Sequence, residues 1–570
     1  MKSNLMYKKI IIAQSIKELK YILKNIDDNN LFCLPLNLKT QIYCEVSEIP
    51  FINLSQYSSN LLHEKIQSDA EKIIKKSNTS FLKLESIKSS YHQWLEYKTV
   101  SVIFLYYMLE EIKKKNKVEK IYTSGWDNFS ILDRESYYTT RVVKNICKGI
   151  EVESIDQIQN IILDYSKIKQ YKIISNVPKN KKNLIFISNL GYNCSKILNW
   201  SYKNNYSSVI PVYKKIHFLK KIFLYFFNTY VLQVIETQSI KKIFKTKLPN
   251  IFFKNINLSD CIYQNKLKVM AFFLNLENKA LLFNNILKKD SFDLIVSNSS
   301  IGIDGSFLEI GKSFKKKTLN IPHGTLTGFF NKGGKIFNKK IGNALFSKYA
   351  VNALQSKIAT QFKKKFKIKK KYCLETGNLI FNSQNKNNGK NILYAETNKD
   401  YFNYRSYGFQ TFYEFLNNLN TLDQLAKKIK LKIYVKPHPN EFDAIGYLKK
   451  KYKNLYFTKD KNKDLFKKIH ITISYSSSMI EDSLYSKIPV ILFDRHKRYK
   501  HCIAEQNVFK KNCSVYYVYK SSNLLKCINT ILKSSAIQYN KYIIPGDVNL
   551  NFNKTLNNIL KQNEESQKIL

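Results

Sequence analysis

The fold is decided by two stretches, LKIYVKPHPNEF at 431–442 and ITISYSSSMIEDSLYSKIPVILFD at 471–494. Each has the same order: an apolar run with strand character, a short polar loop, and a segment with helical spacing. In an open α/β sheet, ligands bind beyond the carboxyl ends of the strands, where such loops lie. We therefore expect the loops 436–439 and 476–478 to meet at one edge of a sheet and to converge on one anion.

The residue types in these loops suit a phosphate. Ser478 and Glu481 have the spacing of a capping box, with Ser478 as N-cap and Glu481 three residues on. Free N–H groups at a helix start, together with hydroxyls, bind phosphate. Pro437 and Pro439 restrict the backbone around His438, which can donate to a phosphate oxygen. The plainer alternative is that the serines only cap a helix and that His438 is a surface residue.

The chain is long and strongly basic. Its 570 residues predict two or more domains. The formal charge is +51, from 94 Lys and Arg against 43 Asp and Glu, which is compatible with nucleic acid, an anionic membrane or acidic substrates as partners. The basic residues are mostly lysines spread along the chain, together with abundant Asn, Ile, Tyr and Phe, as an A- and T-rich genome would encode. Without an Arg-rich cluster or a known module, no nucleic-acid partner is expected.

The cysteines, the N-terminus and the longest apolar run indicate where in the cell the protein is expected. The nine cysteines show no CxxC pair and no metal-ligand spacing with histidine, so they are expected to be reduced and buried. The N-terminus has no cleavage-like site of a secretory signal. The longest apolar run, 222–235, is short for a membrane span and predicts a core helix, with an interfacial membrane helix as the alternative. We expect a cytoplasmic protein, with peripheral contact at the inner face of the cell membrane left open.

Strand-like and helix-like segments alternate along most of the chain, which predicts an α/β fold with parallel sheets and right-handed crossovers. We expect an N-terminal Rossmann-like domain over 1–340, with a basic, aromatic insertion near 202–255. A C-terminal Rossmann-like domain is expected over 341–550, followed by a helical tail over 551–570.

Two loops in the expected N-terminal domain resemble those in the C-terminal one. The strand 292–297 is followed by Asp304 and Gly305, and the strand 317–321 by His323 and Gly324. A glycine beside the histidine permits close approach of the backbone to a ligand. The polar loop 124–128 follows a further strand and is a candidate acceptor contact. The alternative for each of these loops is an ordinary surface connection that takes no part in binding or catalysis.

The order of short motifs resembles bacterial surface-polysaccharide transferases of the GT-B type. These motifs are His-Gly at 323–324, Thr-Gly-Asn at 376–378, ILYAET at 392–397, Lys-Pro-His-Pro at 436–439 and Ser-Ser-Ser-x-x-Glu-Asp at 476–482. Two groups are similar: transferases that use CMP-activated sialic acid or Kdo, and CDP-glycerol glycerophosphotransferases. The resemblance covers roughly 290–500. It implies two Rossmann-like domains facing a cleft, with the nucleotide on the C-terminal domain and the acceptor on the N-terminal one.

The resemblance also implies roles for residues. In these families the HP histidine and the serine motif hold the nucleotide phosphates, here His438, Ser476 and Ser477. The HG histidine, here His323, acts in catalysis in the CDP-glycerol group. The polysialyltransferase-like group instead uses an acidic residue beside a glycine, which Asp304 matches in part, because Ile303 precedes it. Asp304 and His323 are the expected catalytic residues, and the base stays open between Asp304, His323, Asp127 and Glu309. The expected nucleotide and substrate contacts are Lys436, His438, Pro439, Ser476, Ser477, Ser478, Glu481, Thr397, Gly324 and Asn378.

These observations together predict a metal-independent glycosyltransferase without a cofactor. It would move a sugar from a nucleotide-activated donor, with a CMP-linked sugar as the first choice, to a glycan or lipid-linked glycan acceptor of capsule or lipopolysaccharide. The alternatives are a CDP-glycerol-type glycerophosphotransferase, a nucleotide-sugar epimerase, and a non-catalytic assembly protein at the membrane surface.

Overall fold

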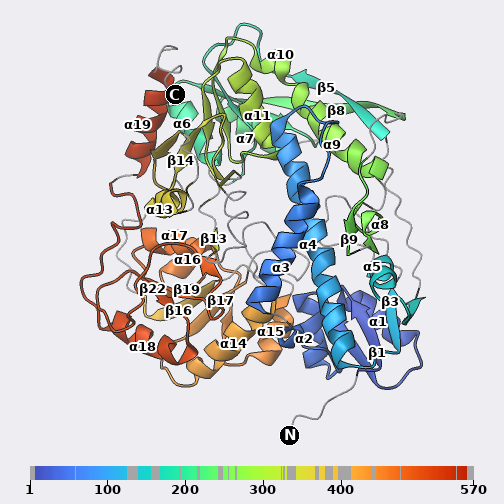
Figure 1. Cartoon of the computed structure of the whole chain (residues 1–570). Coiled ribbons are helices and arrows are strands. Elements are labelled where there is room, and N and C mark those ends of the chain that lie inside the picture. The colour runs from blue at the N-terminus through green and yellow to red at the C-terminus, as the bar shows by residue number, and fades with distance from the viewer. Residues whose placement is uncertain are drawn as a thin grey trace.

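Three mainly parallel sheets organise the chain in the computed structural model (Figure 1). The structure describes residues 7–561 except 58, 125–138, 156–166, 192–193, 215–217, 242–247, 255, 264–265, 323, 325–327, 330–341, 344, 366, 368–371, 379–388, 396–411, 438–443, 476 and 547. The N-terminal and C-terminal sheets lie at one end of the molecule, and the central sheet lies at the other.

The N-terminal sheet has four parallel strands in the order β2-β1-β3-β4. Its strands are β1 (Lys9–Ala13), β2 (Leu31–Pro35), β3 (Lys120–Ser124) and β4 (Glu151–Ile155). Its helices are α1 (Ile16–Lys24), α2 (Leu38–Val46), α3 (Asn60–Ile74), α4 (Glu85–Lys115) and α5 (Thr139–Ile146), with a 3-10 turn η1 (Leu54–Gln56). Buried Ile and Leu side chains of β1, β2, α2 and α4 form its core, as the apolar run of β1 requires.

The central sheet has eight strands in the order β15-β14-β12-β11-β6-β7-β8-β5, all parallel except β5 at the edge. From β6 the chain moves outward through β7 and β8, then returns beside β6 with β11 and moves the other way. This doubly wound order places the topological switch point between β6 and β11. The strands are β5 (Lys167–Ser175), β6 (Leu184–Ile187), β7 (Ser207–Val212), β8 (Thr229–Lys241), β11 (Phe292–Ser297), β12 (Thr318–Asn320), β14 (Val351–Leu354) and β15 (Cys373–Glu375).

Further helices and one short hairpin lie between these strands in the sequence. They are α6 (Cys194–Lys203), α7 (Phe218–Phe226), α8 (Ser259–Ile262), α9 (Lys266–Leu281), α10 (Asn284–Leu287), α11 (Gly302–Ser313) and α13 (Lys357–Lys365), with the β9 (Phe252–Phe253) and β10 (Ile256–Asn257) hairpin.

The C-terminal sheet has six parallel strands in the order β18-β17-β16-β19-β20-β22, which is the Rossmann order with a switch point between β16 and β19. The strands are β16 (Asn391–Ala395), β17 (Ile433–Lys436), β18 (Tyr456–Phe457), β19 (Ile469–Ser474), β20 (Val490–Phe493) and β22 (Val515–Val518). The helices are α14 (Phe412–Ala426), α15 (Ile445–Lys451), α16 (Asn462–Phe466), α17 (Met479–Tyr485) and α18 (Ser521–Leu532). The two stretches quoted at the outset supply β17, β19, α17 and β20.

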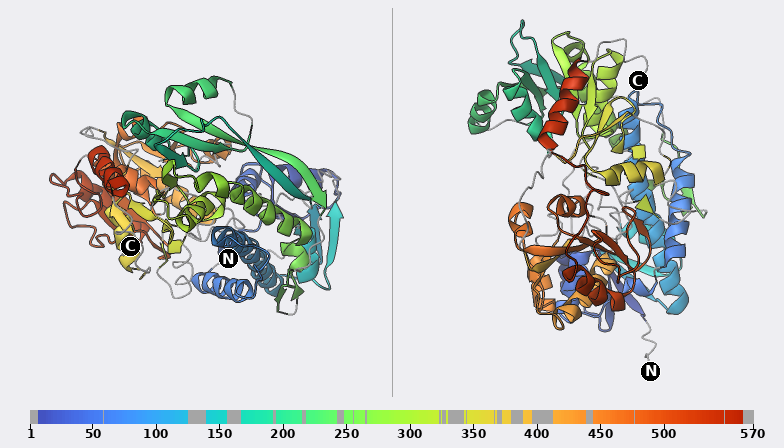
Figure 2. Two further views of the ribbon diagram at one scale, coloured as in Figure 1. Left: turned by 90° about the horizontal axis from the view of Figure 1, so that it is seen from above. Right: turned by 90° about the vertical axis from the view of Figure 1, so that its left-hand side faces the viewer.

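The predicted α/β class with parallel, Rossmann-like sheets is therefore confirmed. The predicted division at residue 340 stays a prediction, but two facts bear on it. β14 and β15 lie beyond residue 340 and pair within the central sheet. The last helix, α19 (Val548–Lys561), returns to the same end of the molecule, where Lys317 Nζ donates to Leu560 O over 2.6 Å (Figure 2).

The expectation of one helix over 222–235 is wrong. The stretch divides at Asn228, whose φ of +49° lies in the left-handed region and ends α7. The residues that follow are rich in β-branched and aromatic types, and they form β8 inside the central sheet. The basic stretch 202–255 thus includes two neighbouring strands of that sheet, β7 and β8. Among the described residues, we find no helix that combines the length and apolarity needed to cross a membrane.

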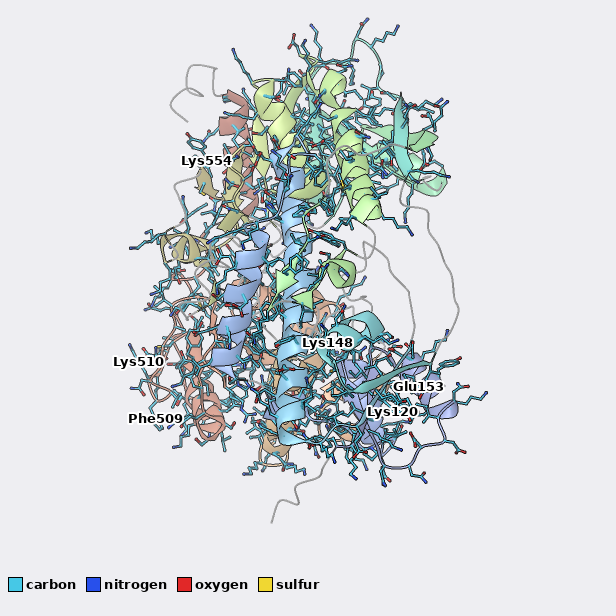
Figure 3. The ribbon with its side chains drawn as sticks, turned by 45° about the vertical axis from the view of Figure 1, so that its right-hand side comes forward. Lys120, Lys148, Glu153, Phe509, Lys510 and Lys554 are labelled. Atoms are coloured by element: carbon cyan, nitrogen blue, oxygen red, sulfur yellow. The ribbon has the colours of Figure 1, made fainter. Side chains whose placement is uncertain are left out.

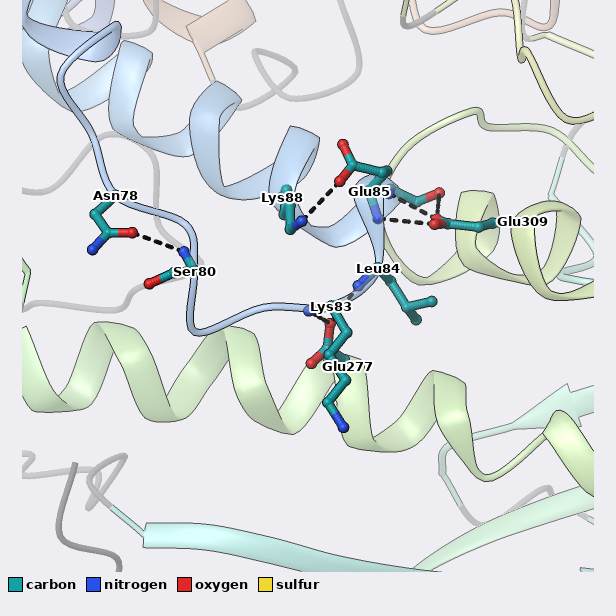
Figure 4. A network of polar contacts seen from close by, with 9 residues as sticks. Asn78, Ser80, Lys83, Leu84, Glu85, Lys88, Glu277 and Glu309 are labelled. Atoms are coloured by element: carbon teal, nitrogen blue, oxygen red, sulfur yellow. Dashed lines mark hydrogen bonds and ion pairs between the residues drawn. The ribbon is translucent and has the colours of Figure 1, made fainter. Parts of the chain in front are cut away.

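The long helix α4 joins the N-terminal and central sheets, and carboxylates from two other helices hold its start (Figure 4). Glu309 of α11 accepts hydrogen bonds from the backbone N–H groups of Glu85 and Ser86, each over 3.0 Å. Glu277 of α9 accepts from the N–H groups of Lys83 and Leu84 over 2.6 and 2.7 Å. These bonds satisfy N–H groups that a helix start leaves free, and the negative charges complement the helix dipole.

Labelled lysines lie in more than one part of the molecule. In Figure 3, Lys554 lies near the upper end, Lys510 at the lower left, and Lys148 and Lys120 near each other in the lower part. Some are paired, such as Lys120, which lies 2.7 Å from carboxylate oxygens of both Glu151 and Glu153. The distribution agrees with a compositional origin of the charge.

Candidate functional site

Helix α17 lies where the carboxyl edges of the central and C-terminal sheets meet. Tyr485 donates its hydroxyl hydrogen to the carbonyl oxygen of Gln355, in the loop after β14, over 2.5 Å. Ser356, in the same loop, donates to the carboxylate of Glu481. Asn378, in the loop after β15, donates to Oδ1 of Asp482 over 3.3 Å. The strand ends of the two sheets therefore face each other across this helix.

Asp482 is the centre of this contact. The residue is buried, and burial together with the neighbouring Glu481 raises its pKa well above the usual range of an aspartate. Asn462, at the start of α16, donates to its second oxygen over 3.4 Å. Asp482 thus receives hydrogen bonds from residues of both sheets, as a buried carboxyl group requires.

Lys436, at the carboxyl end of β17, lies beside this group. Its ammonium donates to Oδ1 of Asn462 over 2.6 Å and to the carbonyl oxygen of Asp460 over 2.5 Å. Burial lowers its pKa, while Asp460 and Asp482 act in the opposite direction. A partly buried cation bonded mainly to neutral oxygens is suited to a further anion.

The serine loop differs from the predicted capping box. Ser478 has helical backbone angles, φ −60° and ψ −18°, and its side chain caps nothing. Ser477 is the residue whose hydroxyl accepts from the N–H of Met479, over 3.2 Å. The carboxylate of Glu481 accepts a hydrogen bond from the hydroxyl of Ser356, in the loop after β14. The packing between the two sheets decides the orientation of Glu481, and a local sequence pattern cannot reveal that.

Gly324 also belongs to this contact. A Cβ atom built on it would lie 3.4 Å from Oε2 of Glu481 and 3.6 Å from Cβ of Ser478. Its φ of +147° is one that L residues rarely adopt. The structure thus brings together Lys436, Ser477, Ser478, Glu481, Gly324 and Asn378 of the predicted set.

A second polar cluster lies at the switch point of the central sheet, after β6 and β11. Asn189 and Asn298 exchange hydrogen bonds over 2.9 and 3.0 Å, and Ser188 donates to Ser297 over 3.2 Å. Asp304, in the first turn of α11, belongs to this cluster. Burial raises its pKa, and hydrogen bonding with Asn189 and Ser188 partly offsets that rise. A carboxylate that burial makes more basic is suited to accept a proton.

Gly305 fixes the position of Asp304. A Cβ atom at Gly305 would lie 2.4 Å from the carbonyl carbon of Ser300. Any other residue would push the first turn of α11 away from the loop after β11. This contact gives a physical reason for the glycine beside the acidic residue.

Several predicted residues have other outcomes. Glu309, one of the four candidate bases, accepts three hydrogen bonds at the start of α4, and its part in catalysis stays a prediction. His323, Asp127, Thr397, His438, Pro439 and Ser476 lie outside the described residues.

The sequence reasoning missed a buried ion pair near the carboxyl edge of the C-terminal sheet. Arg498 Nη1 lies 2.5 Å from Oε1 of Glu414, with side chains 4% and 3% exposed. Tyr499 donates its hydroxyl hydrogen to Glu414 over 2.8 Å and its N–H to Asp494 over 2.9 Å. Burial raises the pKa of Asp494, which directly follows β20, to about 7. The sequence does offer one signal for this group, because the apolar run VILFD ends in Asp494.

Also missed were Asn189, Ser356, Asn462 and Asp482. Asp482 stands next to Glu481 in the quoted stretch, and Asn189 is the second residue after the strand β6 and lies two positions before Gly191. Asn462 and Ser356 carry no signal of this kind.

Comparisons with known proteins give structural similarities only. No protein-family model matches the sequence, and no curated protein matches it. A UDP-GlcNAc 2-epimerase from Neisseria meningitidis bound to UDP-GlcNAc is 14% identical, covers 66% of this chain and 99% of its own, and gives a TM-score of 0.39. A UDP-GlcNAc 2-epimerase from Methanocaldococcus jannaschii is 12% identical, with 66% and 98% covered and a TM-score of 0.36. The wall teichoic acid polymerase TagF soaked with CDPG is 13% identical, with 68% and 89% covered and a TM-score of 0.33. The assignment of the fold therefore rests on the strand orders of the three sheets.

Proposed function

We propose that the protein is a transferase that moves a sugar, or a polyol phosphate, from a nucleotide-activated donor to a surface glycan acceptor. The observation that carries the proposal is the meeting of two Rossmann-type carboxyl edges around α17, with Lys436 and Asp482 on one side and Asn378 on the other. In such sheets ligands bind outside the carboxyl ends of the strands, near the switch point.

The donor nucleotide belongs, in this proposal, on the C-terminal sheet. Lys436 ends β17 and the loop of Ser477 follows β19, and these two strands flank β16 at the switch point. An ammonium, a hydroxyl and the expected His438 are the groups that stabilise negative charge on a departing phosphate. A CMP-linked sugar is our first choice of donor, on the sequence resemblance alone.

The acceptor belongs on the central sheet. Asp304 lies at its switch point, and burial makes its carboxylate more basic than an exposed one. It would take the proton from the acceptor hydroxyl as that oxygen attacks the sugar carbon or the phosphorus. Asn189 and Ser188 hold the carboxylate in position by hydrogen bonds.

A thermal-shift screen of the full chain with CMP, CDP, UDP and GDP tests the donor half of the proposal. One of the four is expected to raise Tm at millimolar concentration, and its sugar or glycerol conjugate to raise it further. If none of the four changes Tm, the nucleotide assignment is wrong.

Product analysis tests the reaction. With the nucleotide-linked donor that binds best, a transferase releases the nucleotide only when a glycan acceptor is present. An epimerase converts the nucleotide sugar to its epimer without any acceptor, and that outcome would overturn the proposal. A protein that binds nucleotide but releases none with any acceptor would support the non-catalytic alternative.

A further inference from the structure

A pocket of about 500 Å³ lies between α3, α4 and the β9–β10 hairpin, away from α17 and from the cluster at Asp304. We call it the α3–α4 pocket. On α3 its lining residues are Lys65, Asp69, Lys72 and Ile73, at intervals that place them on one face of the helix, and Lys76 follows just after the end of that helix. On α4 they are Leu95 and Tyr107, which stand twelve positions apart in the sequence, or about 18 Å along a helix. The pocket is therefore elongated.

The rim of the pocket is cationic. Its lining residues include Lys65, Lys72, Lys76 and Lys254 against a single carboxylate, Asp69. Lys72 pairs with Asp69 over 3.2 Å. All four lysines are exposed, so they can meet an anion that arrives from solution.

Two of these lysines converge on one aromatic ring. The ammonium of Lys65 lies 5.0 Å from the ring centroid of Tyr107, and that of Lys254 lies 4.7 Å from the same centroid. Lys254 stands in the turn of the β9–β10 hairpin with a φ of +44°, so the hairpin presents it toward α4. This end of the pocket carries two positive charges held by cation–π contacts.

The floor of the pocket is apolar and offers few free polar groups. Leu95, Ile251, Phe253 and Tyr263 line it, and all are buried. The Tyr107 hydroxyl already donates to Asp69 over 2.8 Å. The Tyr263 hydroxyl lies 3.5 Å from that of Tyr91. A sugar would leave its hydroxyls without partners on such a floor, which is costly, whereas a hydrocarbon chain would gain by burial.

We propose that the α3–α4 pocket binds an anionic lipid, with the hydrocarbon chain on the floor and a phosphate head group between Lys65 and Lys254. The site is independent of the nucleotide site and of the proposed transfer reaction. Two sources offer this chemistry, a membrane phospholipid and a lipid-linked acceptor, and both present a phosphate on a long chain.

Binding of dodecyl phosphate below its micellar concentration tests the proposal on the full chain. We expect dodecyl phosphate to raise Tm and to bind in titration calorimetry. Inorganic phosphate and the uncharged dodecyl maltoside, which share only one half of its chemistry, should do neither. An equal effect of either one overturns the proposal, because it would show that the pocket recognises only an anion or only a chain.

Variants separate this pocket from non-specific binding. The double variant Lys65→Gln/Lys254→Asn removes both ammonium groups, and Asn tolerates the left-handed turn. We expect its affinity for dodecyl phosphate to fall at least about tenfold. The control Lys75→Gln removes a lysine of the same helical end that pairs with Glu71 and does not line the pocket. Its affinity should equal that of the wild type, and unchanged affinity in the double variant would overturn the proposal.

A filled pocket provides a second test that leaves the lysines in place. Ile73→Phe puts a larger ring on the lining and should also weaken dodecyl phosphate binding, while the Tm shift caused by the best nucleotide stays as in the wild type. A polyanion such as heparin that binds through the same lysines, with no binding of dodecyl phosphate, would show a track for charged polymers and would overturn the lipid assignment.

The source of the lipid follows from two further measurements. Flotation with phosphatidylglycerol vesicles reports membrane phospholipid, and titration with a polyprenyl phosphate in neutral micelles reports a lipid-linked acceptor. Binding that depends on Lys65 and Lys254 in either measurement supports the proposal and identifies the source. Binding in neither overturns it.

Discussion

Asn378 donates a hydrogen bond from Nδ2 to Oδ1 of Asp482 over 3.3 Å, and this bond connects the central sheet to the C-terminal sheet at their carboxyl edges. The two residues are 104 positions apart in the sequence. Both are buried, at 5% and 3% exposure, so the amide and the carboxyl group have little access to water. The contact is therefore both a joint between two units and a part of the candidate site.

Replacing Asn378 tests that joint. Asn378→Ala leaves Oδ1 of Asp482 without its partner, and we expect a loss of about 1–3 kcal/mol in the free energy of unfolding. Urea unfolding of the wild type and the variant measures it. The matched control Asn204→Ala removes an amide that bonds only to its own helix at Trp200, and it should change stability much less. If both variants lose the same free energy of unfolding, the hydrogen bond between Asn378 and Asp482 contributes no more to stability than the bond of Asn204 does.

Lys436 is expected to contribute to nucleotide affinity. Lys436→Met keeps most of the length of the side chain and removes the charge, so the dissociation constant of the best nucleotide should rise about tenfold or more. Burial lowers the pKa of Lys436, so its ammonium should lose its proton at a lower pH than an exposed lysine does. The affinity of the wild type for the nucleotide should therefore fall as the pH rises, before exposed lysines titrate. Calorimetry over a range of pH measures both effects.

The control for Lys436 is a lysine of the same unit. Lys467→Met removes an exposed ammonium 3.8 Å from Asp464, and the dissociation constant should stay as in the wild type. If the two variants bind nucleotide equally well, Lys436 has no part in the site.

Asp304 and Glu309 stand on one helix and are expected to respond differently. Asp304→Asn should lower turnover by about 10²–10⁴-fold while the donor affinity is unchanged, because only the proton acceptor is lost. In the wild type, turnover should rise with pH through the raised pKa of Asp304, and this acidic limb should vanish in the variant. A surviving acidic limb would exclude Asp304 as the base.

Glu309→Gln tests the structural role of the other carboxylate. The variant weakens three hydrogen bonds at the start of α4 and removes a charge that complements its dipole. We expect a loss of about 1–2 kcal/mol in stability, and the acidic limb of the pH profile should be unchanged. Lys312→Gln, an exposed residue of the same helix, serves as control. A shifted pH profile in Glu309→Gln would favour that residue as the base.

The sequence reveals much of the C-terminal sheet because its signals are local. Each of β17, β19 and β20 is an apolar run that ends in a polar or proline-containing loop, and the alternation with helices implies parallel pairing. The turn at Asn228 and the orientation of Glu481 depend instead on tertiary contacts. The separate N-terminal sheet is equally hidden, because Lys9 pairs with Lys120 across a long stretch of chain. The contacts of Asp482 cannot be read locally for the same reason.

Glu18 gives a prediction for that N-terminal sheet. It lies in the first turn of α1, is 3% exposed, and accepts hydrogen bonds from the N–H of Gln14 over 2.6 Å and from the hydroxyl of Ser124. Burial raises its pKa to about 7. The folded state therefore binds a proton more tightly than the unfolded chain does. Its contribution to stability is complete below pH 4.5 and is lost as the pH rises to about 7.

The neutral variant Glu18→Gln should remove this dependence on pH. Relative to the variant, the wild type should lose about 3 kcal/mol of stability in the N-terminal unit between pH 4.5 and pH 8. Hydrogen exchange of the β1 and β3 amides at the two pH values reports the stability of that unit. Glu119→Gln is the control, because Glu119 is 45% exposed and pairs weakly with Lys8 at 3.8 Å. If the wild type and Glu18→Gln keep the same difference in stability at both pH values, the carboxyl group of Glu18 titrates as an ordinary exposed one.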